Sequence, residues 1–293
     1  MTVSGLVVVD KPAGVTSHDV VARVRKIAGT KKVGHAGTLD PMATGVLVLG
    51  INKATRLLGH LMMAEKTYDA TVRLGASTNT DDAEGEVTAQ TGAAELSEGA
   101  VRVALKAFEG SIQQVPSTVS AIKVGGQRAY KLAREGQEVV LQPRTVTIHS
   151  LEVSDVRREG DFVDVDVTIS CSSGTYIRAI ARDLGAALGV GGHLTALRRT
   201  EVGPFGLEDA RLSLDEMKAS GELNLIALPD VGERLFFNVR VDEKQASDIA
   251  FGRPLDLVLP VADSPVAMLG PDGTFLALYE QRGEHAVAVA VLV

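Results

Sequence analysis

Two segments of strictly alternating apolar residues constrain the fold of this chain most. In 67–74 (TYDATVRL) every second residue is apolar, and in 161–171 (DFVDVDVTISC) the alternation returns. A period of two is typical of a strand with one buried face. Stretches with helical spacing lie around these strands, without a regular strand–helix–strand order. The pattern therefore favours an α+β fold over a doubly wound parallel sheet.

The remaining elements are expected from apolar spacing and from turn residues. The first helix is expected to begin after Thr16 or Ser17 and to end at Gly29. The other expected elements are strands over 5–10 and 46–51, helices over 101–110 and after Gly174, and a loop over 77–96.

The character of the sequence changes after Pro229. The C-terminal segment contains FFNVRV, an expected short helix near 242–250, and three short strands around the turn PDG (271–273). These features predict a small β-rich domain at this end. The chain is therefore expected to divide into a large domain over 1–234 and a small one over 235–293.

Length and composition limit the class of protein. The chain has 293 residues, of which 45% are hydrophobic, enough for a large core and a second small domain. No apolar run reaches the length of a membrane span, and the N-terminus lacks the basic leader of a secretory signal. The single cysteine, Cys171, excludes an intrachain disulfide and a cysteine metal cluster. A reduced, cytosolic setting is expected.

Charge is distributed unevenly along the chain. The net charge is −7, but residues 1–66 and 102–134 each carry +5, and residues 176–200 carry +3. If the fold brings these three segments together, they form a positive surface suited to nucleic acid. The alternative is that each segment is an ordinary solvated face.

The sequence lacks most of the widespread catalytic motifs. It has no G-x-x-x-x-G-K-[ST] loop for phosphates, no G-x-G-x-x-G after a strand, and no G-x-S-x-G. Its six histidines are scattered and show no metal-ligand spacing. The sequence therefore predicts neither a nucleotide cofactor nor a metal site.

The loop GHAGTLDPMATG (34–45) holds one carboxylate, Asp40, among three glycines and a proline. An Asp before Pro is often only a turn residue. The alternative is a carboxylate aimed by a stiff backbone, which needs an arginine to position it and keep it ionised. Arg178, near the start of a helix, is the candidate partner. Tyr68 is either a core aromatic or a platform on which a base stacks.

Six segments, in order and nearly end to end, carry a family likeness. They resemble the motifs of the bacterial tRNA pseudouridine synthases of the TruB family, which modify the T-loop uridine at tRNA position 55. The segments are GLVVVDKPAGVTS (5–17), KVGHAGTLDPMATGVLVL (32–49), KTYDATVRLG (66–75), PSTVSAIKVGGQRAYKLAREG (116–136), GTYIRAIARDLG (174–185) and HLTALRRTEVGPF (193–205).

This resemblance implies the pseudouridine synthase fold, an α+β fold with a mostly antiparallel mixed sheet and a central cleft. It implies that 1–234 is the catalytic domain, that about 117–140 is an RNA-clamping element, and that 235–293 is a PUA-like RNA-binding domain. The implied partner is the T-arm stem-loop of tRNA, and the implied state is a cytoplasmic monomer.

The resemblance also implies roles for individual residues. Asp40 matches the catalytic aspartate, Tyr68 the tyrosine that stacks on the target base, and Arg178 the arginine that pairs with the aspartate. Leu197 matches an apolar residue of the active site, and His35 a histidine near the flipped nucleotide. The residues expected to contact RNA are Lys11, Lys31, Lys32, Arg128, Lys131, Arg134 and Arg198, although Lys11, with Pro12, matches a motif that also suits a structural role.

The implied reaction detaches uracil at N1 and rejoins it to C1′ through C5. No atoms or electrons enter from outside, so no cofactor and no metal are expected. The base must leave its stack, which costs a few kcal/mol. Asp40 then attacks C1′, adds to the ring, or removes a sugar proton, and the sequence leaves these three routes open.

Two other functions remain as alternatives at this stage. A tRNA-folding chaperone that modifies nothing fits the basic segments and the small C-terminal domain. An aspartate-dependent glycosidase normally needs a second catalytic carboxylate. Asp10 and Asp19 lie near the first motif, but neither is set in a comparable pattern.

Overall fold

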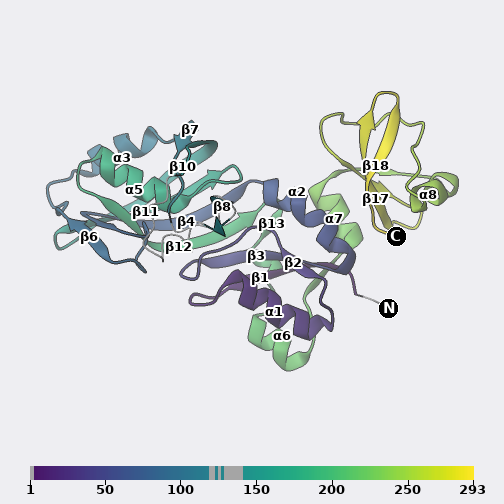
Figure 1. Ribbon diagram of the computed structural model, residues 1–293, viewed down its shortest axis with the longest axis horizontal. Helices are drawn as coiled ribbons and strands as arrows, with labels where there is room; N and C mark the ends of the chain where they lie inside the picture. Colours follow the sequence, from purple (N-terminus) through teal and green to yellow (C-terminus); the bar gives the residue numbers. More distant parts are fainter. Residues whose placement is uncertain (1–2, 119–122, 125–126, 129–140) are drawn as a thin grey trace.

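A large mixed sheet and a smaller four-stranded sheet form the frame of the molecule (Figure 1). The structure is a computed structural model that describes residues 3–118, 123–124, 127–128 and 141–293. The predicted RNA-clamping element, about 117–140, lies mostly outside the described residues. Lys131 and Arg134, two of its predicted RNA contacts, lie outside them as well.

The strands of the large sheet come from most of the chain. They are β1 (Gly5–Lys11), β2 (Val33–His35), β3 (Thr44–Ile51), β4 (Lys66–Leu74), β7 (Gly110–Gln114), β10 (Arg144–Glu159), β11 (Phe162–Cys171), β12 (Gly192–Val202), β13 (Phe205–Gly206) and β14 (Leu225–Ala227). The other strands are β5 (Ala76–Thr78) with β6 (Val87–Gln90), β8 (Lys123–Val124) with β9 (Gln127–Arg128), and β15 (Phe237–Arg240), β16 (Val266–Leu269), β17 (Phe275–Arg282) and β18 (His285–Val291) of the smaller sheet.

The helices are short. The α-helices are α1 (Ser17–Ala28), α2 (Leu58–Met63), α3 (Glu98–Lys106), α5 (Ile177–Ala187), α6 (Leu214–Ser220), α7 (Leu228–Leu235) and α8 (Glu243–Ala250), and the 3-10 helices are η1 (Asn52–Leu57) and η2 (Leu207–Asp209). None of the helices in the described part of the chain is long and apolar enough to cross a membrane.

The large sheet consists of two antiparallel halves joined by one short parallel contact. The main strand order is β14-β1-β3-β12-β4-β11-β10-β7. Strands β3 and β12 pair in parallel over two residue pairs, Thr44 with Arg198 and Gly45 with Arg199, whereas every other pairing of the main order is antiparallel. The prediction of a mostly antiparallel mixed sheet is confirmed. The joint between β3 and β12 leaves room for a site between the halves.

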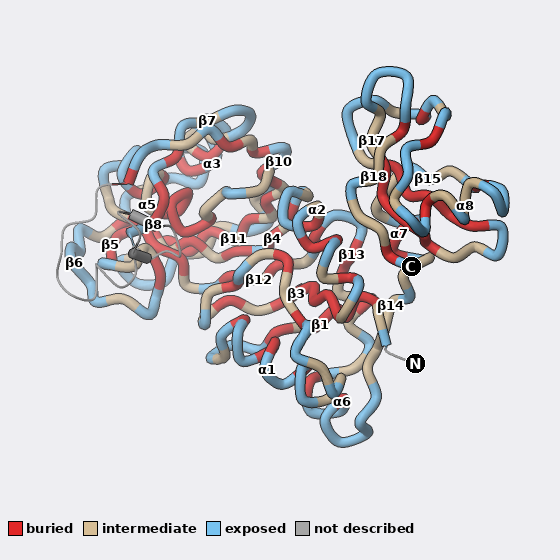
Figure 2. Tube along the Cα trace, turned by 45° about the vertical axis from the view of Figure 1, so that its right-hand side comes forward, coloured by how far each residue is buried: buried red, intermediate tan, exposed pale blue. Residues whose placement is uncertain are grey.

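Apolar cores cover both faces of β1 and β3. Alternate residues of these strands enter a core shared with α1, α3, α5 and α6, and the others enter a second core with η1, α2 and α7. Burial on both faces explains the continuous apolar run GLVVV at the start of β1. Figure 2 shows the strands mostly buried at the centre and the loops exposed at the rim.

The smaller sheet has a core of its own and also packs on the second core of the large unit. Tyr279 and Met268 lie in the separate core, whereas Phe275 and Leu269 join the core beneath α7. Helix α7 lies between the two sheets, close to the predicted boundary at 234/235 (Figure 1). A small β-rich unit at the C-terminus agrees with the expected fold.

Most of the expected elements are present, with three differences. Thr16 caps α1 through a capping box with Asp19, and Gly29 ends the helix, as predicted. The helix expected over 101–110 is α3, which starts earlier because Ser97 caps it, and ends at Lys106. Residues 77–96 are not simply a loop, because β6 lies within them and pairs with β5. The long strand β10 is not among the predicted elements.

Candidate active site

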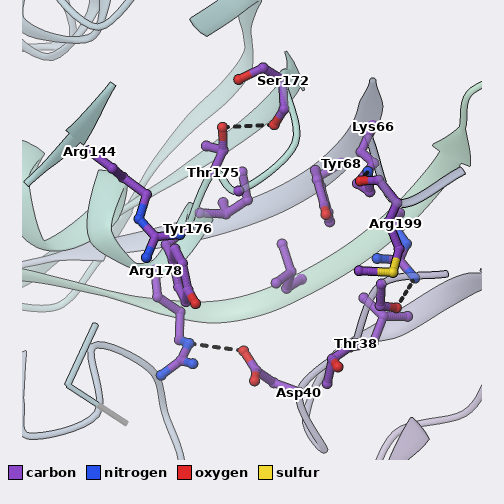
Figure 3. Close-up of a pocket in the computed structure, with 16 residues that line it drawn as sticks. Thr38, Asp40, Lys66, Tyr68, Arg144, Ser172, Thr175, Tyr176, Arg178 and Arg199 are labelled. Atoms are coloured by element: carbon purple, nitrogen blue, oxygen red, sulfur yellow. Dashed lines mark hydrogen bonds and ion pairs between the residues drawn. The ribbon is translucent and has the colours of Figure 1, made fainter. Parts of the chain in front are cut away.

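A cavity of about 340 Å³ lies where the two halves of the large sheet meet (Figure 3). Its wall combines the loop before β3 with residues of β4 and β12 and the start of α5. The wall includes Asp40, Lys66, Tyr68, Arg178, Leu197 and Arg199. Three of the motifs singled out in the sequence therefore meet with the Asp40 loop at one cavity.

Asp40 and Arg178 form an ion pair at this cavity. The Nε atom of Arg178 lies 3.0 Å from Oδ2 of Asp40, as Figure 3 shows. The arginine side chain is only 4% exposed, whereas that of Asp40 is 37% exposed and remains open to a ligand. Arg178 is held from behind, because its Nη1 donates to the carbonyl of Thr80 at 2.8 Å and lies 3.5 Å from the buried carboxylate of Asp82.

Lys11 supports the Asp40 loop from inside the protein. Its side chain is fully buried, and its Nζ donates to the carbonyls of Pro12 (3.0 Å), Val15 (2.8 Å) and Pro41 (3.2 Å). Burial lowers the pKa of Lys11, although the nearby Asp40 partly offsets this. The prediction that Lys11 contacts RNA is therefore wrong, because the ammonium group is used to hold two loops together.

Ser17 is a second internal support of the same loop. Its buried Oγ donates to the carbonyl of Leu39 at 3.1 Å and accepts from the Leu39 amide at 2.9 Å. The backbone amide of Gly14 also donates to the carbonyl of Pro41 at 2.8 Å. The residues on both sides of Asp40 are thus fixed to the turn and helix that follow β1, which limits the freedom of the carboxylate.

Arg199 joins the Asp40 loop to the central strands. Its side chain is 1% exposed, its Nε donates to the carbonyl of Val46 at 2.7 Å, and its Nη2 donates to that of Gly37 at 3.1 Å. Gly45, which pairs with Arg199 in the contact of β3 with β12, allows the two backbones to come this close. It has a φ of +100°, and a Cβ at this position would lie 2.1 Å from the carbonyl oxygen of Arg199.

Tyr68 and Leu197 form the buried part of the cavity wall. Both side chains are less than 10% exposed, and both line the cavity. Burial raises the pKa of Tyr68, and the positive charge of the Arg199 guanidinium partly opposes that rise. The phenol is therefore neutral at physiological pH, and its ring presents an apolar face to the cavity.

Lys66 adds a second buried cation to this wall. Its Nζ donates to the carbonyls of Met62 at 3.0 Å and Ala64 at 2.6 Å. Burial and the positive charge of Arg199 lower the pKa of Lys66 to about 8. Among the described residues, neither Lys66 nor Arg199 forms an ion pair with a carboxylate.

Carboxylates other than Asp40 lie outside the described cavity wall. Asp10 pairs with Arg198 at 2.6 Å, and Asp19 accepts from the backbone and hydroxyl of Thr16 at the start of α1. Neither supplies the second catalytic carboxylate of a glycosidase. The described residues also contain no group of three or more His, Cys, Asp or Glu arranged to hold a metal ion.

His35 lies at the edge of the site. It belongs to β2, is half-buried, and packs edge to face against His18 with ring centroids 5.7 Å apart. Its Nδ1 is buried without a hydrogen-bond partner among the described residues, and burial lowers the pKa of the imidazole. His35 is not part of the cavity wall, so its predicted place beside the flipped nucleotide stays a prediction.

The predicted RNA contacts lie in different surroundings. Lys31 and Lys32 are exposed between α1 and β2. Arg198 alternates with Leu197 and Arg199 along β12, so its side chain points to the other face of the sheet. The structure describes the backbone of Arg128, which lies in β9, but not its side chain. These RNA contacts stay predictions.

Several site residues received no role from the sequence. Lys66 and Arg199 lie inside motifs that carry the family likeness, but a lysine or arginine in a strand ordinarily indicates an exposed face. Asp82 lies in the acidic segment expected to be a loop. Its contact with Arg178 joins residues 96 positions apart, which no local pattern reveals.

The fold is shared with solved structures. A Cbf5–Nop10–Gar1 complex matches with a TM-score of 0.75 and 26% identity, over 99% of this chain and 85% of that chain. An H/ACA RNP bound to a substrate RNA containing 2′-deoxyuridine matches with a TM-score of 0.73 and 26% identity, over the same shares. The architecture is that of the pseudouridine synthases.

Comparison with protein families shows to which family of pseudouridine synthases the chain belongs. Residues 25–177 match the family described as TruB family pseudouridylate synthase (N terminal domain), residues 178–224 match tRNA pseudouridylate synthase B C-terminal domain, and residues 236–293 match tRNA Pseudouridine synthase II, C terminal. The chain belongs to the TruB family of pseudouridylate synthases.

Curated relatives agree with this assignment over nearly the full length. A protein of Arthrobacter sp. (strain FB24) named tRNA pseudouridine synthase B is 56% identical over 98% of this chain and 96% of its own. One of Thermobifida fusca (strain YX) with the same name is 54% identical over 98% of both chains.

Proposed function

We propose that this protein is a tRNA pseudouridine synthase that isomerises a uridine of the T-loop, at position 55, with Asp40 as its catalytic group. The observation that carries the proposal is the Asp40–Arg178 ion pair of 3.0 Å at a cavity walled by Tyr68 and Leu197. One carboxylate, held and still half open to the cavity, is what each of the three possible routes requires.

The residues around Asp40 have different roles in the proposed reaction. Arg178 orients the Asp40 carboxylate, and the buried carboxylate of Asp82 holds Arg178 in turn. The ring of Tyr68 receives the extruded base, because stacking on an aromatic ring contributes about 1–3 kcal/mol per base. Leu197 keeps water from the detached uracil, which has to be rejoined to the sugar.

The substrate is the T-arm stem-loop of tRNA, bound by shape and phosphate contacts more than by base stacking. Lys31, Lys32 and Arg198 are the described residues proposed to contact RNA, and His35 is proposed to lie beside the flipped nucleotide. Residues 1–234 form the catalytic domain, and 235–293 form an RNA-binding domain. The family likeness favours a monomer in the cytoplasm.

Tritium release from a T-arm stem-loop labelled at C5 of the target uridine tests this proposal. Wild-type protein is expected to release the label without added metal or cofactor. Asp40→Asn is expected to release none, while its Kd for the RNA stays within about tenfold, or about 1.4 kcal/mol, because the amide preserves the shape of the loop. Asp215→Asn makes the same change at an exposed carboxylate of α6 and is expected to behave as wild type.

The outcome decides between the candidate functions. Full activity of Asp40→Asn excludes Asp40 as the catalytic group. No release from the wild type, with tight RNA binding, excludes T-loop isomerisation and favours the tRNA-folding chaperone.

A further inference from the structure

The roles proposed above leave two buried cations of the cavity unused. Lys66 is 7% exposed and Arg199 is 1% exposed, and both line the same cavity as Asp40. Figure 3 shows them on one side of the cavity with Tyr68, whereas Arg178 lies on the other side and pairs with Asp40. Arg144 also lines the Arg178 side and lies over the ring of Tyr176, 5.7 Å from its centroid. On the Tyr68 side, Lys66 and Arg199 give the wall an excess of positive charge.

The hydrogen bonds of these two cations do not neutralise them. Lys66 donates to two backbone carbonyls, and so does Arg199. An ammonium group has three N–H donors and a guanidinium has five, so each retains donor capacity. Burying a cation without an anionic partner is costly. Lys11 is also buried among carbonyls, but it does not line the cavity, whereas Lys66 and Arg199 do. Their charge therefore points to a ligand in the cavity that becomes negative.

The reaction itself generates such a charge, and it does so on the base. When the N1–C1′ bond breaks, by attack of Asp40 at C1′ or by loss of a sugar proton, its electron pair stays on uracil. When Asp40 adds to C6 of the ring, the π electron pair of the C5=C6 bond moves onto C5 and the neighbouring carbonyl oxygen, and the bond to Asp40 breaks again later in the reaction. In every case C5 later gives up its proton as the C5–C1′ bond forms, N1 regains one, and no electrons are gained or lost overall.

We propose that Lys66 and Arg199 form an electrostatic cradle that stabilises the negative charge of the uracil base during its isomerisation. The inference rests on the proposed function. Donors fixed before the reaction and shielded from water stabilise developing charge strongly. Stacking of the base on Tyr68 places it on the side of the cavity that Lys66 and Arg199 line (Figure 3). Arg199 also holds the Asp40 loop through the carbonyl of Gly37, so Lys66 is the cleaner residue to test.

The test is single-turnover tritium release by Lys66→Met, a variant that keeps the length of the side chain and removes its charge. The rate is expected to fall about a hundredfold, the usual effect of losing one such donor, with the Kd for RNA unchanged within about threefold. Lys218→Met, at an exposed lysine of α6, is the matched control and is expected to react at the wild-type rate.

A substrate with 5-fluorouridine at the target position separates charge stabilisation from simple positioning. Fluorine withdraws electrons and stabilises the detached base by itself, so the rate of its consumption should depend less on Lys66. The deficit of Lys66→Met is expected to shrink clearly on this RNA. An equal deficit on both substrates contradicts the proposal. A raised Kd with a lower salt dependence also contradicts it, because that result identifies a phosphate contact.

The pH profile gives a second, independent readout. The groups that face Lys66 are Arg199 on β12, whose charge lowers the pKa of Lys66, and Cys171 on β11, whose own pKa burial raises to about 11. Because Lys66 loses its proton above about pH 8, the wild-type rate is expected to fall from pH 7 to 9. Lys66→Met lacks this decline, and Lys66→Arg, which stays charged, retains its rate at pH 9.

Failure of this inference is distinguishable from failure of the proposed function. An active wild type with Lys66→Met equally fast on uridine RNA leaves the function intact and excludes the cradle. An inactive wild type contradicts both. Urea unfolding of Lys66→Met guards against a structural effect. Because the variant no longer buries a charge, its stability is expected to match or exceed the wild-type value. If the variant loses both stability and activity, Lys66 only stabilises the fold and the proposal is contradicted.

Discussion

Ser17 shows how single buried side chains position the catalytic carboxylate. It is the first residue of α1, yet its hydroxyl serves the loop of Asp40, 22 residues further along, through both the amide and the carbonyl of Leu39. Thr16, one residue earlier, caps the helix. The two neighbouring hydroxyls therefore have separate tasks, one in the helix and one in the active site.

Replacing Ser17 by Ala separates these tasks. The variant leaves a buried N–H and a buried C=O without a partner, which costs about 1–3 kcal/mol in unfolding free energy. Its single-turnover rate is expected to fall, because Asp40 gains freedom, while RNA affinity is unchanged. Thr16→Ala is the control, since loss of the cap costs about 0.5–2 kcal/mol without touching Leu39. Equal rates in the two variants would show that Ser17 does not position Asp40.

The sequence predicted the contact between Asp40 and Arg178, but it did not predict the buried side chains that hold the Asp40 loop in place. Asp40 and Arg178 were expected to meet, and the structure places them in contact. Lys11 was expected to contact RNA, although its motif also suited a structural role, and only the tertiary fold shows that its ammonium group is surrounded by carbonyl oxygens. The bond to Pro41 joins residues 30 positions apart, and no local spacing encodes it.

The short parallel contact of β3 with β12 is the element on which the site depends. It joins the half-sheet that carries the Asp40 loop to the half that carries Tyr68. Gly45 lies in this contact because its backbone is left-handed and because the carbonyl of Arg199 occupies the place of a side chain. The glycine therefore serves the joint between the halves in addition to the turn before β3.

Gly45→Ala tests the joint. We expect a loss of at least about 3 kcal/mol in unfolding free energy, since both the backbone angle and the contact with rigid backbone are unfavourable. Gly59→Ala in α2 is the control. No atom lies near its missing Cβ, and alanine favours helix, so its stability is expected to be unchanged or about 0.5 kcal/mol higher. Urea unfolding measures both, and a Gly45→Ala variant of wild-type stability would contradict the account.

Elements with a local signal were predictable, and those without one were not. The cap at Thr16, the stop at Gly29 and the alternation of β4 and β11 are all local features, and each was found. The 16-residue strand β10 is exposed at many positions, so its apolar pattern is weak. Its place is set by pairing with β7 and β11, which is a long-range property.

At the scale of the whole molecule, part of the positive charge of the basic segments lies inside, because Lys11, Lys66, Arg178 and Arg199 are buried in the described part of the chain. Of the four cations in the basic segment 176–200, Arg178 and Arg199 are buried, and Arg182 and Arg198 are in ion pairs. The segment was expected to add to a positive surface if the basic segments converged. It does meet the N-terminal segment at the β3–β12 joint, but mainly to build the cavity.

RNA attraction is therefore expected to depend on the exposed lysines of the N-terminal segment. Lys31→Glu with Lys32→Glu is predicted to weaken tRNA binding and to lower the slope of log Kd against log salt by about 1.5 units, because each phosphate contact contributes about 0.7–0.9. The single-turnover rate at saturating RNA is expected to be unchanged, since neither residue lines the cavity. Lys106→Glu with Lys218→Glu alters the net charge equally on exposed faces of α3 and α6 and is the control. If both pairs lower the slope equally, the attraction arises from net charge alone and Lys31 and Lys32 make no phosphate contact.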